Sequence, residues 1–164
     1  MERFSTSTRV TPVMSELTRM RAFLRSFLMS AFQLREESAA VDDFILAVNE
    51  ALANVIGHAY TTDTGGFIDL DVRAIDGTAT VRIIHNGRPF NSEAAEPPSF
   101  DGSRDHGFGL YIIDTVSDSV DYSSSPDGQQ VITISKTVTD TGRNLKDMEF
   151  QTRTAGPVAI VTVP

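Results

Sequence analysis

A line of polar side chains on one predicted helix combines residue types that can bind a metal ion and accept a proton. Glu50, Asn54 and His58 follow one another at four-residue steps within residues 46–60, LAVNEALANVIGHAY, and so share one helix face. A carboxylate can serve as a general base, and a side-chain amide oxygen can bind Mg²⁺. No Lys or Arg lies in this segment, although a solvated face would be expected to carry them. The pattern predicts the floor of a polar pocket, with an ordinary solvated helix face as the alternative.

Two glycines further along the chain stand where an anion can bind. Gly107 and Gly109 come just before a short helical pattern, LYIIDTVS, and let backbone N–H groups at a helix N-terminus approach a phosphate. The pair lacks the Gly-Lys-Ser/Thr of a Walker loop, and an ordinary turn is the alternative. Residues 86–106 show no sustained periodicity, which predicts a lid or binding loop, with plain surface disorder as the alternative.

Hydrophobic periodicity predicts an α+β domain over residues 1–138 that positions these groups. We expect a two-layer α/β sandwich, in which helices cover one face of a mixed sheet. Alternation in residues 78–85 puts His85 on the apolar face of a strand. The predicted strands are residues 3–9, 67–74, 78–85, 119–124 and 130–138, and the helices follow Thr11-Pro12, begin near Ser38 and cover residues 110–117. The predicted apolar stripe of the second helix is Val41, Phe44, Ile45, Val48, Leu52, Val55, Ile56 and Ala59.

Composition narrows the classes of partner. The 164 residues carry a net charge of −8, which argues against binding to nucleic acid or to an anionic membrane surface. Cysteine is absent, which excludes disulfides and thiolate metal sites. Lys136 and Lys146 are the only lysines, so phosphate chemistry would depend on arginine, metal or backbone groups. No apolar run approaches the roughly 18 residues that cross a bilayer, and we expect a cytoplasmic protein.

The ordered set of motifs resembles the GHKL ATP-binding fold, and ExxxNxxxHAY is especially similar to the small bacterial anti-sigma-factor serine kinases. The likeness covers residues 4–138. The resemblance implies that Asn54 holds a Mg²⁺ ion that bridges the phosphates of ATP. It also implies that Glu50 is the general base that takes the proton from an attacking serine hydroxyl.

The same resemblance assigns the remaining nucleotide contacts. Gly87 resembles the glycine that lies under the adenine, and Gly107 and Gly109 resemble the phosphate-contacting glycines that follow the lid. Arg104, or in second place Arg88, would neutralise phosphate charge. For either arginine, an ordinary solvated loop residue is the alternative.

One residue departs from the family pattern. The family has an aspartate that accepts a hydrogen bond from the adenine amino group, whereas this chain has His85 at that position, in the run His85-Asn86-Gly87-Arg88-Pro89-Phe90. A neutral imidazole nitrogen can accept this bond, but without the assistance of a charge. The loss of a charged hydrogen bond costs about 1.5–3 kcal/mol, or roughly 10- to 100-fold in affinity. We therefore expect nucleotide binding that is weakened, altered in base preference, or lost.

The C-terminal tail has a resemblance of its own. Residues 139–149 are typical of a linker, and residues 150–164 predict an extra strand. The tail MEFQTRTAGPVAIVTVP resembles the opening strands of a STAS domain, the fold of anti-anti-sigma factors, which are the substrates of these kinases. The alternative is a strand that pairs with this domain's own sheet or with a second copy of the chain.

Together these resemblances imply an ATP- and Mg²⁺-dependent serine/threonine kinase. Its substrate would be a STAS-domain anti-anti-sigma protein, and it would regulate a sigma factor by partner switching. Family members often dimerise, so the resemblance also implies a homodimer. The alternative is a non-catalytic partner-switching module that has lost ATP binding at His85. A histidine-kinase catalytic domain is the third possibility.

Overall fold

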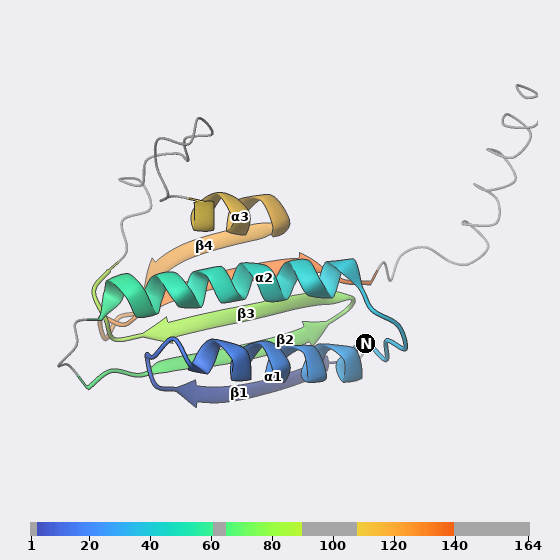
Figure 1. Cartoon of the computed structure of the whole chain (residues 1–164), viewed down its shortest axis with the longest axis horizontal. Coiled ribbons are helices and arrows are strands. Elements are labelled where there is room, and N and C mark those ends of the chain that lie inside the picture. Colours follow the sequence, from blue (N-terminus) through green and yellow to red (C-terminus); the bar gives the residue numbers. More distant parts are fainter. Residues whose placement is uncertain (1–2, 61–64, 90–107, 140–164) are drawn as a thin grey trace, which may run out of the picture.

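The computed structural model describes residues 3–60, 65–89 and 108–139 and has two layers, a sheet and a group of helices on one of its faces (Figure 1). The elements in chain order are β1 (Arg3–Val10), α1 (Glu16–Ala31), α2 (Ala39–Asn54), the π-helical turn η1 (Val55–Ala59), β2 (Ile68–Ile75), β3 (Thr78–His85), α3 (Phe108–Val116), β4 (Ser119–Ser124) and β5 (Gln130–Thr137). These bounds agree with the predicted elements to within a few residues.

The strands form one sheet in the order β1-β2-β3-β5-β4, and every neighbouring pair is antiparallel. The α+β class is confirmed, but the prediction of a mixed sheet is wrong. β3 and β4 run in the same direction, because both pair antiparallel with β5. Since β5 lies between them, the two parallel strands never become neighbours.

The predicted Asp-Gly hairpin joins β2 to β3. Asp76 and Gly77 have φ values of 49° and 79°, as the two central residues of a type I′ turn require. This turn fixes the register in which Ile68 lies opposite His85 at the other end of the hairpin. His85 therefore ends its strand on the core side of the sheet.

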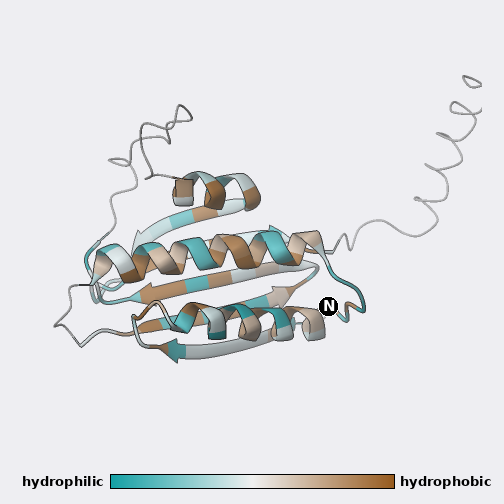
Figure 2. Cartoon of the chain, in the orientation of Figure 1, coloured by the Kyte–Doolittle hydropathy of each residue, from teal (hydrophilic) through white to brown (hydrophobic). Residues whose placement is uncertain are grey.

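The core lies between the sheet and the helices, and apolar stripes on α1 and α2 alternate with polar ones (Figure 2). The predicted stripe of α2 is confirmed, because all its members are buried except Ile56, which is partly buried. Arg19 and Arg25 lie on the exposed side of α1, where they pair with Glu16 and Asp42.

Local signals fix the two ends of the site-bearing helix. The Ser38 hydroxyl accepts a hydrogen bond from the Val41 N–H at 3.4 Å and caps α2 at its N-terminus. At the other end α2 continues into η1, a single π-helical turn of the kind that is frequent at functional sites. The widened turn changes the four-residue spacing beyond Asn54, and His58 lies within it.

Several predicted features lie outside the described residues. These are residues 90–106 of the predicted lid, which include Arg104, then Gly107, and the C-terminal tail from residue 140. Within the described ranges, no helix combines the length and the apolar character needed to cross a membrane.

Candidate functional site

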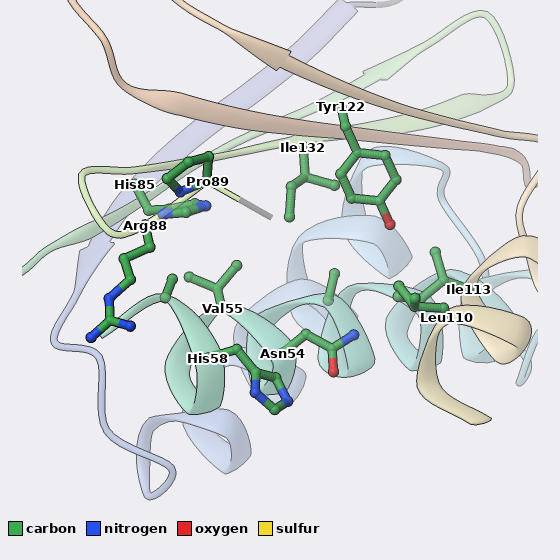
Figure 3. A pocket seen from close by; sticks show the side chains of 12 residues that line it. Asn54, Val55, His58, His85, Arg88, Pro89, Leu110, Ile113, Tyr122 and Ile132 are labelled. Atoms are coloured by element: carbon green, nitrogen blue, oxygen red, sulfur yellow. The ribbon is translucent and has the colours of Figure 1, made fainter. Parts of the chain in front are cut away.

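A pocket opens between the two layers, where α2 runs into η1 and β3 ends (Figure 3). It has a volume of about 80 Å³, several times what one water molecule requires. Its apolar lining consists of Ala51, Val55, Ala59, Pro89, Leu110, Ile113 and Ile132. The polar side chains around it are Asn54, His58, His85, Arg88 and Tyr122. An apolar cavity with a few separate polar groups is typical of a small-molecule site.

The start of α3 meets two polar side chains of α2. A Cβ atom placed on Gly109 would lie 3.2 Å from Oε2 of Glu50 and 3.5 Å from both amide atoms of the Asn54 side chain. A glycine at this position therefore leaves α3 and the polar line of α2 in close approach. The structure brings Glu50, Asn54 and Gly109 together, and places Asn54 on the pocket wall.

The loop after β3 packs directly on the end of η1. The Arg88 N–H donates a hydrogen bond to the Ala59 carbonyl at 2.8 Å. A Cβ atom on Gly87 would lie 2.7 Å from both the Cβ and the carbonyl oxygen of Ala59. Only glycine fits this approach without displacing the backbone, so Gly87 holds the rim of the pocket against the helix end.

A tyrosine that the sequence analysis did not single out fixes the same loop. The Tyr60 hydroxyl lies 2.5 Å from the Phe67 carbonyl oxygen and 2.9 Å from Oδ1 of Asn86, so it has two acceptors within reach. The Asn86 N–H donates back to the Tyr60 oxygen at 3.2 Å, and Oδ1 of Asn86 also accepts from the Phe67 N–H at 3.3 Å. Tyr60 follows His58 in the quoted motif, which was the available signal.

His85 is the one buried polar residue among the described residues, with 1% of its surface exposed. It shares the core side of β3 with Val81 and Ile83, as the alternation predicted. Its Nδ1 accepts a hydrogen bond from the Gly87 N–H at 3.2 Å. Burial also lowers the pKa of the imidazole, because the charged form is poorly solvated there. The ring is therefore neutral at pH 7 and its Nδ1 carries no proton.

We expect His85 to make the protein less stable towards acid. The folded pKa is lowered, so the unfolded chain binds a proton at a pH where the folded chain does not. The free energy of unfolding should then fall as the pH drops below the unfolded value of about 6.5. Denaturant titrations between about pH 7.5 and pH 5.5 test this, since His85→Asn should show a smaller fall. Asn49→Ala, which removes no titratable group, is the control and should keep the native slope. Equal slopes in His85→Asn and the native chain would contradict the assignment.

Comparison with known proteins identifies the domain. A family model described as "Histidine kinase-like ATPase domain" matches residues 12–136, which is most of the chain. The chain belongs to this family. The matched span of the histidine kinase-like ATPase domain includes every residue that lines the pocket. Arg88 is exposed on the pocket wall.

Curated relatives of this ATPase domain include serine-protein kinases named RsbW. Over 89 residues the chain is 30% identical to the protein of Listeria monocytogenes, 30% to that of Halalkalibacterium halodurans and 26% to that of Oceanobacillus iheyensis. These matches cover 49% of this chain and 57%, 54% and 56% of the three relatives. The match thus spans a little over half the length of each relative.

A solved structure supports the fold of the ATPase domain. The histidine kinase domain of a blue-light activated histidine kinase from Erythrobacter litoralis superposes with a TM-score of 0.50 at 12% identity. The superposition covers 78% of this chain and 62% of that one.

Proposed function

We propose that the chain is a protein serine/threonine kinase of the anti-sigma-factor type, which uses Mg²⁺ and a purine nucleoside triphosphate. ATP is the nucleotide that the family resemblance implies. The observation that carries the proposal is the meeting of Glu50, Asn54 and Gly109 beside an otherwise apolar pocket. The matched family and the relatives named serine-protein kinase support the same class of reaction.

The donor set at this end of the pocket fits a magnesium–phosphate group. The described residues contain no cluster of three or more His, Asp or Glu side chains that would hold a metal ion by itself. Mg²⁺ commonly keeps several waters and takes its other ligands from substrate phosphates and one or two side chains. Asn54 would supply the protein ligand, and the bound magnesium nucleotide would supply an electrophilic γ-phosphorus.

Glu50 is placed to handle the proton in this reaction. It lies one helical turn before Asn54, half-buried, with its carboxylate beside the start of α3. A serine hydroxyl that attacks the γ-phosphate must lose its proton, and a carboxylate within reach can accept it. Gly109 keeps Cβ bulk away from this carboxylate, so that α3 does not displace it.

Charge neutralisation depends on few groups. Arg88 is the one cationic side chain that lines the pocket in the described part of the chain. Arg104 and the backbone N–H groups at Gly107 remain our proposed further phosphate contacts, and both lie outside the described residues.

The partners follow from the same proposal. A STAS-domain anti-anti-sigma protein would be the phosphorylated substrate, a sigma factor the regulated partner, and a second copy of the chain the other half of a homodimer. All three are proteins, in keeping with a net charge of −8 that disfavours nucleic acid. The extra strand of residues 150–164, as the start of a STAS domain, stays a prediction.

The second candidate function is a non-catalytic partner-switching module. His85 favours it, because it stands where the family has the aspartate that binds adenine. Titration with ATP, GTP and ITP (inosine triphosphate), each with Mg²⁺, separates the two functions. Saturable binding of at least one nucleotide supports the kinase. If none of them binds saturably at millimolar concentration, the kinase is excluded and the non-catalytic partner-switching module remains.

Asn54→Ala should weaken both nucleotide binding and phosphotransfer, because the proposed metal ligand is lost. The loss in Mg²⁺-dependent affinity should be about 10- to 100-fold. Calorimetric titration of the magnesium nucleotide measures it. Asn49→Ala is a matched control on the same helix, since Asn49 bonds to Arg21 at 2.8 Å and does not line the pocket. Equal nucleotide affinity in the two variants would remove Asn54 from the metal site.

A further inference from the structure

The pocket wall carries one buried histidine, His85, whose two ring nitrogens differ in what they can bind. His85 ends β3 on the core side, and its ring lies beside Pro89 on the pocket wall (Figure 3). A neutral imidazole has one donor nitrogen and one acceptor nitrogen. Which nitrogen does which is set by the bond that the other one makes.

A backbone N–H group already occupies the acceptor nitrogen of the His85 ring. Nδ1 of His85 accepts from the Gly87 N–H at 3.2 Å, so the ring proton must be on Nε2. A proton on Nδ1 would bring two donors face to face at this distance. A ring flip would leave the Gly87 N–H without its acceptor, which costs about 1–3 kcal/mol for a buried group. The expectation that an imidazole nitrogen accepts from an adenine amino group therefore does not fit this geometry.

The described residues around His85 offer no carboxylate in its place. A second hollow adjoins the pocket and shares His85, Pro89, Tyr122 and Ile132 with it. Among the described residues, neither hollow has an Asp or Glu in its lining. The nearby Oδ1 of Asn86 is engaged by Tyr60 and by the Phe67 N–H. An exocyclic amino group on a base would thus meet the Nε2–H donor with no carboxylate beside it.

From this arrangement we infer that His85 selects the base of the nucleotide, and that the pocket prefers a 6-oxopurine such as guanine or hypoxanthine over adenine. The inference rests on the proposed function, since it concerns the nucleotide of that same site. A 6-oxo group accepts the bond that Nε2–H donates, whereas the 6-amino group of adenine opposes one donor with another. An aspartate at this position would reverse the preference, because an ionised carboxylate only accepts hydrogen bonds and would pair with the 6-amino group of adenine.

Equilibrium titration with ATP, ITP and GTP in Mg²⁺ tests the inference without any activity assay. ITP is the sharpest probe, because it differs from ATP only at position 6 and the adjoining ring nitrogen. The native chain should bind ITP about 3- to 10-fold more tightly than ATP, as one neutral hydrogen bond gained predicts. His85→Asp should favour ATP over ITP by about tenfold. ATP binding that equals or exceeds ITP binding in the native chain would overturn the inference and leave the kinase proposal standing.

A second variant covers the case in which a buried carboxylate prevents folding. His85→Asn keeps a neutral acceptor for the Gly87 N–H, and its amide offers both a donor and an acceptor. The ratio of ITP to ATP affinity should then fall towards one, and an unchanged ratio would contradict the role of His85. The control is Asn49→Ala, which lies outside the lining of both hollows and should keep the native ratio. Failure of all three nucleotides to bind the native chain would instead overturn the proposed function, and this inference with it.

The tautomer can be tested in the chain without nucleotide. Nitrogen-15 NMR of histidine-labelled protein distinguishes a protonated ring nitrogen from an unprotonated one, and the signal that is lost in His85→Asn assigns the residue. We expect a neutral ring with the proton on Nε2. A proton on Nδ1 would overturn the inference.

Discussion

Glu50→Gln is expected to lower the rate of phosphotransfer about 10²- to 10⁴-fold, with little change in nucleotide affinity. Glutamine keeps the size of the side chain but cannot accept the serine proton. The carboxylate lies near the Cβ position of Gly109, and it is not among the residues that line the pocket itself. Its removal should therefore affect the chemical step more than binding. Transfer of labelled γ-phosphate to a STAS-domain protein measures the rate, and calorimetry measures the affinity.

Asp42→Asn is the matched control for this result. Asp42 is an exposed carboxylate on the same helix, and it pairs with Arg25 at 2.6 Å on the side facing α1. Its variant should retain native phosphotransfer, which separates a general loss of negative charge on α2 from the loss of the base. Phosphotransfer that survives in Glu50→Gln would assign the proton to another acceptor.

Gly87→Ala is expected to destabilise the fold by about 2–4 kcal/mol and to abolish nucleotide binding. The new Cβ would lie 2.7 Å from the Ala59 carbonyl oxygen, a backbone atom that cannot rotate away. Relief of the clash must move the loop, which strains the Arg88 N–H bond to Ala59 and the Gly87 N–H bond to His85. Denaturant unfolding followed by circular dichroism measures the loss of stability.

The matched control for this substitution lies across the contact, in η1. A Cβ on Gly57 would meet only the Met14 methyl group at 3.6 Å, an ordinary packing distance. Gly57→Ala should therefore be neutral or stabilising by up to about 1 kcal/mol, as expected for alanine in a helical turn. A Gly87→Ala variant as stable as Gly57→Ala would show that the loop yields freely.

The sequence was sufficient to predict the features that depend on residue periodicity. The apolar stripe of α2 follows directly from a 3.6-residue repeat, and the position of His85 on the core side follows from alternation in β3. Asp76-Gly77 predicted its turn, because few other pairs accept two positive φ angles. In each case one local rule determines the outcome.

Features that depend on contacts between residues far apart in the chain could not be predicted from such local rules. Alternation does not say which strand lies next to which, so the position of β5 between β3 and β4 was not predictable from it. The bonds of Tyr60 to Phe67 and Asn86 join segments whose proximity only the folded sheet creates. The tautomer of His85 likewise depends on the backbone of Gly87, and sequence alone left either ring nitrogen available.

The division of the pocket between a strand and a helix has a consequence for inheritance. The residue that we infer to face the base, His85, belongs to β3, and the proposed proton acceptor, Glu50, belongs to α2. Main-chain contacts at Ala59 hold the two elements together whatever side chain occupies position 85. Histidine and aspartate codons differ by a single base. One point mutation would thus exchange the cellular nucleotide pool on which the protein draws, while the machinery for transferring phosphate stayed as it was.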